Sequence, residues 1–505
     1  MALPGRSEAS DGARNPQAML RMAADAFKAG RHAESDALCR RILSLVPGQP
    51  NTLHLLGLVR FNLRDYNAAI SHLETALETF GDLAELHLHL GNAYCEIGDA
   101  DRALSAFGRA LDLQPVFPEA HFNRARVHER IGRLDLAEKE LRKALSQRDA
   151  YTAAVLNLGN VLKKSNRSLE ALEIYYDALA KTPDVAALHN NLGNLQVECG
   201  KAKEARHSFE RAVSLSPGLR DAHINLAQLL LDDGDTKQAV YHFDSAGTGY
   251  ARARAAECLL NMGRIADVKK RLQDSAGSEP NNLLLVALSA FMTATGDQRD
   301  DPFDFCRNPL DFVRVRPGLG GIDDCIGFGT DLKEELRKRN QLWSPQNSST
   351  RQGYQTPDDL FDHPTGILSE LEQIIRKEIA AYKRIKSGAD NRMMREWPER
   401  YRLRGWAVRL LKGGQQASHI HPDGWLSGVA YLTMPTEAHY PAGGIEFTLA
   451  GANYPKTAAS LPVRLHPPNV GDLVLFPSSL HHRTIPFDND AERLSIAFDV
   501  VPLRN

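Results

Sequence analysis

The sequence predicts a multidomain protein in which an all-α array of helical repeats is followed by an α+β domain built on a β-barrel or jelly roll. Three observations predict this architecture. The length of 505 residues exceeds what one ordinary hydrophobic core holds. A 34-residue pattern recurs through the N-terminal half. Beyond residue 400, short apolar segments alternate with turns rich in Gly, Pro, Asn and Asp.

The composition is that of an ordinary globular protein. Charged residues make up 25% of the chain and hydrophobic residues 43%, and a net charge of −2 argues against nucleic acid or membrane partners. No apolar run approaches the roughly 20 residues that span a bilayer. The polar segment 1–16 lacks a signal-peptide core and is expected to be disordered. Six scattered cysteines without a CxxC pair are typical of a reducing compartment, so we expect a soluble cytoplasmic protein.

Successive segments of the N-terminal half match position by position at intervals of 34 residues. Small residues recur at one position in each of two expected helices, where the two helices must approach closely. Turn glycines such as Gly98 and Gly132 fall between those helices. The two series are Gly57, Gly91, Ala125, Gly159, Gly193 and Ala227, and Ala69, Ala103, Ala137, Ala171, Ala205 and Ala239.

This register resembles that of the tetratricopeptide repeat family over residues 17–283. The resemblance implies a superhelix of about eight helix pairs over 17–290, with degenerate units at its ends. It also implies a concave face that binds a protein or peptide.

Asparagines form two columns along the first helices of the repeats. An asparagine side chain offers a donor and an acceptor, so a column can pair with the backbone of an extended peptide whatever its sequence. The columns resemble the asparagine ladders of the sugar-transferring O-GlcNAc enzymes and predict a peptide-binding surface. The alternative is a solvated face that tolerates asparagine without a ligand. The residues are Asn123, Asn157, Asn191 and Asn225, and Asn92, Asn160 and Asn194.

The repeat phase is lost near residue 290. The segment 291–312, rich in Asp and Pro, is predicted to be a linker. Residues 313–400 are predicted to support the C-terminal core with helices over 329–343 and 366–384, and 401–505 to form that core. Two helices before a set of strands indicate an α+β domain.

Seven segments beyond residue 400 have the character of strands, and residues 344–356 before them have that of a loop. The strand segments are 404–412, 415–421, 425–434, 443–450, 462–467, 471–477 and 493–503.

His419, His421 and Asp423 alternate at the end of one expected strand. Residues two apart on a strand share a face, so either His419 with His421 or His421 with Asp423 can offer two ligands to one metal ion. A third ligand is available from the pair His481 and His482, which follows a buried apolar strand. Without a metal, the same residues would form a satisfied polar cluster.

Two close ligands, a distant histidine and an arginine about ten residues later resemble the signature of the Fe(II) and 2-oxoglutarate-dependent oxygenases. The segments HIHPDGWLSGVAYL and LFPSSLHHRTIPFDNDAERLSIAF are similar to one branch of them, with an HxHPxxxLSG core. The resemblance covers about 310–503 and implies a double-stranded β-helix, or jelly roll, that uses Fe(II), 2-oxoglutarate and O2. It implies that Arg493 pairs with the far carboxylate of 2-oxoglutarate and that Ser495 donates to it. Tyr431 would help to hold the 2-oxo acid.

The resemblance leaves the iron ligands open. The HxD motif common in the superfamily gives His421, Asp423 and His482, whereas the HxHP core gives His419, His421 and His482. We favour Asp423, with His419 as the alternative, because a carboxylate neutralises charge and suits Fe(II). His481 is expected to point to the other face and to have a minor role.

Together these features predict an Fe(II)- and 2-oxoglutarate-dependent dioxygenase, a hydroxylase acting on a protein or peptide that the repeats recruit. The repeats alone would also suggest a glycosyltransferase, but the C-terminal strands carry no nucleotide-sugar motif. Two further alternatives remain. The domain could hydroxylate a small molecule while the repeats serve assembly, or it could be inactive within an interaction scaffold.

Overall fold

The computed structural model describes residues 15–297, 300–320, 325–339, 341–344, 349–435, 441–456 and 460–503. Residues 1–14 of the segment that we expected to be disordered lie outside the described residues. The chain divides into two compact units, residues 1–225 and 226–505.

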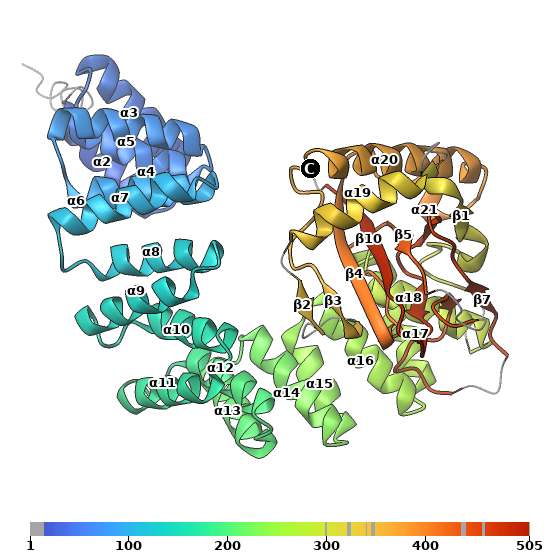
Figure 1. Ribbon diagram of the computed structural model, residues 1–505. Helices are drawn as coiled ribbons and strands as arrows, with labels where there is room; N and C mark the ends of the chain where they lie inside the picture. The colour runs from blue at the N-terminus through green and yellow to red at the C-terminus, as the bar shows by residue number, and fades with distance from the viewer. Residues whose placement is uncertain are drawn as a thin grey trace, which may run out of the picture. The chain divides into compact units, whose positions relative to one another are not determined.

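The repeats are a series of helices that pack pairwise (Figure 1). Seven first helices begin at Pro16, Pro50, Ala84, Pro118, Thr152, Ala186 and Arg220, each 34 residues after the previous one, which confirms the predicted period. No helix in the described ranges is long and apolar enough to cross a membrane. The helices are α2 Pro16–Lys28, α3 His32–Leu45, α4 Pro50–Asn62, α5 Tyr66–Phe80, α6 Ala84–Glu96, α7 Ala100–Leu113, α8 Pro118–Arg130, α9 Leu134–Gln147, α10 Thr152–Lys164, α11 Ser168–Lys181, α12 Ala186–Glu198, α13 Ala202–Leu215, α14 Arg220–Asp232, α15 Thr236–Ala246, α16 Gly249–Asn261, α17 Ile265–Ser278 and α18 Leu283–Ala294.

Close approach of the paired helices explains the small residues of the repeat. A Cβ atom at Gly91 in α6 would collide with the ring of Phe107 in α7, and one at Gly193 would collide with Phe209. Ala103, in the second series, is completely buried. The turn residue Gly98 has a φ of 81°, a left-handed conformation that glycine adopts without steric cost. These positions therefore hold the register of the repeats.

The second unit also contains the supporting helices and all the strands described. These elements are the short helix η1 Pro309–Phe312, β1 Arg314–Arg316, the short helix η2 Gly318–Gly320, α19 Cys325–Arg337, β2 Leu342–Trp343, β3 Thr350–Gln355, α20 Ile367–Lys386, α21 Arg392–Arg395, β4 Tyr401–Gln416, β5 Leu426–Thr433, β6 Ile445–Thr448, β7 Val463–His466, β8 Leu473–Pro477, β9 His481–Thr484 and β10 Arg493–Pro502.

Two antiparallel sheets form the β-rich core. One has the strand order β1-β8-β5-β10-β4-β3-β2 and the other the order β7-β6-β9. A hydrophobic cluster joins the two sheets, with Tyr431 and Phe476 from the large sheet and Phe447 from the small one. This arrangement confirms the predicted fold class, a helical-repeat array followed by a jelly-roll domain.

Strand β10 lies between β4 and β5 and has two buried faces. Leu494, Ile496, Phe498 and Val500 belong to the large hydrophobic core of the unit, whereas Ala497 belongs to the cluster between the sheets. Because side chains alternate along a strand, Arg493, Ser495 and Asp499 share the face of Ala497. Strand β10 therefore presents polar side chains toward the interior between the two sheets.

The strands differ from the sequence prediction in five places. Strand β1 was not predicted and pairs with β8. The helix predicted over 329–343 ends at Arg337, and Leu342–Trp343 instead form β2, which pairs with β3. Strand β3 forms inside the predicted loop 344–356, because it pairs with β4. The segment 415–421 is not a separate strand, since β4 continues to Gln416 and His419 forms an isolated bridge. Strand β9 pairs with β6 and was not predicted, because two histidines and an arginine carry no apolar alternation.

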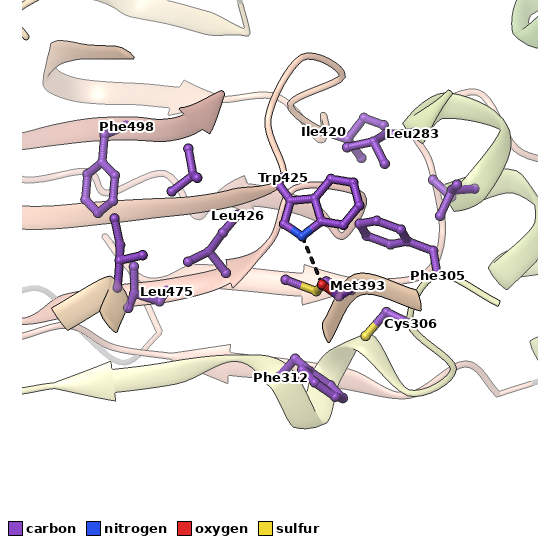
Figure 2. Packing of buried hydrophobic residues seen from close by; sticks show 14 of the residues in the cluster. Leu283, Phe305, Cys306, Phe312, Met393, Ile420, Trp425, Leu426, Leu475 and Phe498 are labelled. Carbon is purple, nitrogen blue, oxygen red and sulfur yellow. Dashed lines mark hydrogen bonds between the residues drawn. The ribbon is translucent and has the colours of Figure 1, made fainter. Parts of the chain in front are cut away.

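The last repeat shares one hydrophobic core with the jelly roll. Leu283 of α18 lies near Ile420 and Trp425, and Phe305 packs against Trp425 with ring centroids 5.0 Å apart (Figure 2). The indole of Trp425 donates to the carbonyl of Met393 over 3.0 Å. Phe305 is fully buried although it belongs to the segment predicted to be a linker.

Candidate metal centre

Three histidines from two separate segments of the chain lie together in the jelly-roll domain. One side-chain ligand atom from each of His419, His421 and His482 lies within 4.8 Å of the other two. His419 and His482 form a backbone bridge, with N···O distances of 3.1 and 3.0 Å. His421 is fixed beside them, because its backbone NH donates to the carbonyl of Ser478 over 3.0 Å.

The ring nitrogens of the three histidines divide into two sets. Nδ1 of His419 lies 2.7 Å from the carbonyl oxygen of Ala417. Nδ1 of His421 lies 2.5 Å from a carboxylate oxygen of Asp499. Nδ1 of His482 lies 3.1 Å from the carbonyl oxygen of Leu480. Carbonyl and carboxylate oxygens only accept, so each Nδ1 carries the proton. Nε2 of each ring is then the nitrogen that faces away from these acceptors and is available to bind a metal ion.

The spacing of the nitrogens suits a common metal ion. The Nε2 atoms of His419 and His421 are 3.3 Å apart. Two nitrogens at right angles around one ion, each bound at about 2.1 Å, would be about 3 Å apart. Burial lowers the pKa of His419 to about 3 and that of His482 well below its ordinary value, so both rings are neutral at neutral pH. The residues present therefore fit a divalent metal ion.

Asp423 lies outside this group of histidines. Its side chain is 73% exposed and lies 3.7 Å from the guanidinium of Arg404. The chain turns sharply after His421, where the backbone NH of Gly424 donates to the His421 carbonyl over 3.2 Å. Residues 421 and 423 are therefore separated by a turn and do not alternate on one strand. The structure brings His421 and His482 together with His419, the alternative to Asp423.

His481 points toward a different environment from that of His482. Its Nε2 atom lies 3.5 Å from the hydroxyl of Tyr454, and burial lowers its pKa to about 4. Tyr454 in turn packs on Phe291 of α18, with ring centroids 4.8 Å apart. His481 thus contacts the core that joins the last repeat to the jelly roll.

Arg493 is a buried cation between the two sheets. Its side chain is 1% exposed and lies over the ring of Tyr431, with the guanidinium carbon 5.0 Å from the ring centroid. It donates to the Gly443 carbonyl over 3.1 Å and to the Ser495 hydroxyl over 3.3 Å. Within the described ranges no carboxylate pairs with it, although burying a charge without a counterion is costly. The surroundings of Arg493 therefore fit an anionic ligand.

The sequence did not lead us to Asp499, Ser427 and Ser478. Ser427 donates to Asp499 over 2.6 Å, and its hydroxyl oxygen lies 2.7 Å from that of Ser478. All three side chains are buried. A charged residue within the apolar run IAFDVV was the available signal, because a buried carboxylate requires partners.

A cavity opens beside His419 and His421. It has a volume of about 650 Å³ and is lined by His419, His421, Trp406, Thr356 and Arg404 among other, mostly polar, residues. A cavity of this size with a polar lining can hold a side chain or a small polar molecule next to a metal ion.

Comparison with known families agrees with this geometry. Residues 404–499 match the family described as "Putative 2OG-Fe(II) oxygenase". Tetratricopeptide repeat families match residues 48–115, 88–155, 156–219 and 190–253. A search of curated proteins finds no match.

Solved structures similar to the chain are repeat proteins. A tetratricopeptide repeat protein from Parabacteroides merdae is 17% identical with a TM-score of 0.39, and the alignment covers 46% of this chain and 92% of that one. A thermophilic repeat protein from Thermus thermophilus is 21% identical with a TM-score of 0.29, over 43% of this chain and 100% of that one.

Proposed function

We propose that this chain, in which tetratricopeptide repeats precede a domain of the 2OG-Fe(II) oxygenase family, is a dioxygenase that hydroxylates a protein or peptide. The observation that carries the proposal is the convergence of His419, His421 and His482, whose Nδ1 atoms all face acceptors. These three residues would hold Fe(II), with His419 in the place for which the sequence favoured Asp423. Three ligands on one side leave the other iron positions open.

Arg493 would bind the far carboxylate of 2-oxoglutarate. Its guanidinium can make a bidentate pair with that carboxylate, and Ser495, on the same strand face, can add a hydroxyl donor. Burial raises the pKa of Tyr431 to about 12, so its hydroxyl stays protonated and can donate to the co-substrate. The absence of a carboxylate partner for Arg493 within the described ranges supports this role.

Bound together, Fe(II), 2-oxoglutarate and O2 supply the oxidising power to hydroxylate a C–H bond, with succinate and carbon dioxide as the other products. The chain contributes ligation, orientation and exclusion of water. Phe476 and Phe447 contact the ring of His482, with centroids 4.6 and 6.2 Å away, and keep the inner side of the centre dry. The polar cavity on the outer side would receive the substrate.

Space for an extended substrate leads away from the centre toward the last repeats. The cavity beside the histidines shares Arg404 and Asp423 with a second cavity of about 290 Å³. The second cavity shares Asn281 and Asp423 with a third, of about 580 Å³, whose lining includes Tyr250 of α16. A small metabolite would need the first cavity alone, so this continuity supports a polypeptide substrate.

The asparagine columns offer further support for recruitment of a peptide. The Asn123 amide donates to Asn92 over 2.9 Å, and that of Asn225 donates to Asn190 over 3.0 Å. The paired amides link neighbouring repeats and retain acceptors and donors for a ligand. We propose that Asn157, Asn160, Asn191 and Asn194 complete this peptide-binding surface.

The cysteines support a cytoplasmic location, which we also propose. Cys39, Cys95, Cys199, Cys258 and Cys306 are free thiols, as a reducing compartment maintains them.

The proposal is tested by loading the full-length protein with Fe(II) and 2-oxoglutarate without oxygen and recording its visible metal-to-ligand charge-transfer band. We expect the band in the wild type and in Asp423→Asn, and its loss in His419→Ala and His482→Ala. Arg493→Lys keeps the charge but loses the planar fork, so 2-oxoglutarate should bind about 10- to 100-fold more weakly. A folded wild type without the band would refute the oxygenase function. A band lost in Asp423→Asn but kept in His419→Ala would replace His419 by Asp423 in the ligand set.

Recruitment is tested separately with an immobilised array of extended peptides of varied sequence. If the wild type binds peptides of varied sequence and the double variant Asn157→Ala/Asn191→Ala does not, the result would support a surface that recognises the peptide backbone. Equal binding by the wild type and the double variant would contradict it.

A further inference from the structure

The acceptor for His421 differs in kind from those for the other two histidines. Ala417 and Leu480 accept through backbone carbonyls, which exist whatever residue occupies those positions. His421 instead donates to the side chain of Asp499, which lies 78 residues further along the chain. One ligand of the proposed centre is therefore oriented by a side chain that mutation can remove.

The hydrogen bonds around Asp499 have a defined direction. The Ser427 hydroxyl has one proton and donates it to the Asp499 oxygen over 2.6 Å, so the Ser478 hydroxyl, 2.7 Å away, must be the donor to Ser427. The same Asp499 oxygen accepts from His421 Nδ1, and the Ser427 hydroxyl oxygen lies 3.0 Å from that nitrogen as a second, longer acceptor. Because two donors converge on one buried oxygen, this carboxylate is held as an acceptor. The proton on His421 is thereby fixed at Nδ1.

The backbone around this network leaves little freedom. A Cβ at Gly424 would lie 2.6 Å from the Ser478 hydroxyl and 3.2 Å from the Asp499 carboxyl carbon, so the turn after His421 packs directly on the network. The Trp406 ring contacts the His421 ring, with centroids 5.4 Å apart. Close packing restricts rotation of the imidazole as well as its tautomer.

Asp499 is also linked to the opposite end of the site. It lies on the same face of β10 as Arg493 and Ser495, and β10 is paired on both sides, with β4 and with β5. One strand thus carries the carboxylate that orients a metal ligand and the cation proposed to bind the co-substrate. Such a strand can fix the distance between the two.

We propose that Asp499 is a positioning residue for the metal centre: it holds His421 in the Nδ1–H tautomer with Nε2 directed to the ion, and Ser427 and Ser478 hold Asp499 in turn. The inference rests on the proposed function, because it concerns the same three histidines. A carboxylate that accepts from a ligating histidine also makes the imidazole a stronger donor to the metal. Asp423 is exposed to solvent and lies away from the three histidines. The carboxylate next to them is therefore that of Asp499.

The test measures metal binding by the full-length protein rather than turnover. Fe(II) affinity is determined anaerobically by competition with a chelator, and the visible spectrum of bound Co(II) reports the ligand geometry. Asp499→Asn keeps the shape of the side chain, and we expect it to weaken Fe(II) binding about 10- to 100-fold and to change the Co(II) spectrum. Asp490→Asn is the matched control, because Asp490 is 92% exposed beside Lys412. Its affinity and spectrum should equal those of the wild type.

Ser427→Ala is the milder second variant. It leaves Asp499 bonded to His421 but removes one of the two donors to the carboxylate, so Fe(II) binding should weaken less than in Asp499→Asn. Should Asp499→Asn fail to fold, Ser427→Ala decides: wild-type affinity and spectrum in that variant overturn the inference.

The possible failures are distinguishable. If folded Asp499→Asn binds Fe(II) as tightly as the wild type and gives the same Co(II) spectrum, Asp499 is a structural residue and the metal centre stands. If the wild type itself binds neither metal, the proposed function fails, and the inference about Asp499 fails with it.

Discussion

Truncation of Leu283 to alanine should destabilise the jelly roll, although Leu283 lies in the last helix of the repeats. Its side chain is 2% exposed and belongs to the same hydrophobic core as Ile420 and Trp425 (Figure 2). Arg392, from the helical support, donates to the carbonyl of Pro280 and to Asn281 just before α18. The helix is therefore held on the jelly roll by both apolar packing and hydrogen bonds.

The size of the effect follows from the burial of the side chain. A buried Leu→Ala change costs about 2–5 kcal/mol, because transfer free energy is lost and a cavity remains. Leu283 is buried beside Ile420 and Trp425, so we expect a value near the middle of that range, about 3 kcal/mol. With an m-value of about 3 kcal/mol/M in urea, the unfolding midpoint would fall by about 1 M.

The tryptophans make the assay specific. The four tryptophans, Trp343, Trp397, Trp406 and Trp425, all lie in the second unit and none in the repeats. Their fluorescence therefore follows unfolding of the jelly roll and its supporting helices. A lower midpoint in Leu283→Ala, observed by tryptophan fluorescence, would mean that α18 and the jelly roll unfold together.

Leu56→Ala provides the control. Leu56 is also 2% exposed, but it lies in the first unit, in a cluster with Ala23 and Cys39. It should lower the helical circular dichroism midpoint without moving the tryptophan transition. The reasoning is refuted if Leu283→Ala leaves the tryptophan transition of the wild type unchanged while it lowers the helical one.

The remaining predictions concern the repeats and the buried histidines. Gly91→Ala should destabilise the first unit by about 1–3 kcal/mol in helical circular dichroism, because the new Cβ meets Phe107. Gly108→Ala, where nothing lies within 4 Å of the added Cβ, should be neutral or stabilising by up to about 1 kcal/mol, and equal effects would contradict this account. Burial holds the pKa of His419 at about 3 and that of His481 at about 4, below the unfolded value, so the unfolded chain binds more protons as pH falls from about 6.5 toward 4. Stability of the metal-free protein should fall in that window by about 1.4 kcal/mol per pH unit for each histidine, and urea midpoints in His481→Gln should show a shallower slope.

The repeats could be predicted because the sequence features that define them lie close together along the chain. The 34-residue period fixes where each first helix begins, and the small residues fix where each pair makes contact. Both features appear within a single repeat and are then reinforced by the next. The proximity of Arg493 and Ser495 was equally local, since residues two apart on a strand share a face.

The cluster of three histidines depends on contacts between distant segments. Whether His419 or Asp423 lies beside His421 and His482 is decided by the bridge between His419 and His482 and by the turn at Gly424. Neither can be read from the spacing of the ligands, because the same spacing allows an uninterrupted strand. Asp499 could not be predicted for the same reason, because its hydrogen bond to His421 joins residues that are 78 positions apart in the sequence.

The sequence by itself therefore determined the two kinds of architecture and the chemistry of the side chains available to the site. Tertiary structure alone decided which of those side chains converge, which carboxylate lies next to His421, and that α18 shares a core with the jelly roll. The physical reason is that helix and strand patterns reflect neighbours along the chain, whereas a site is set by the register in which distant strands pair.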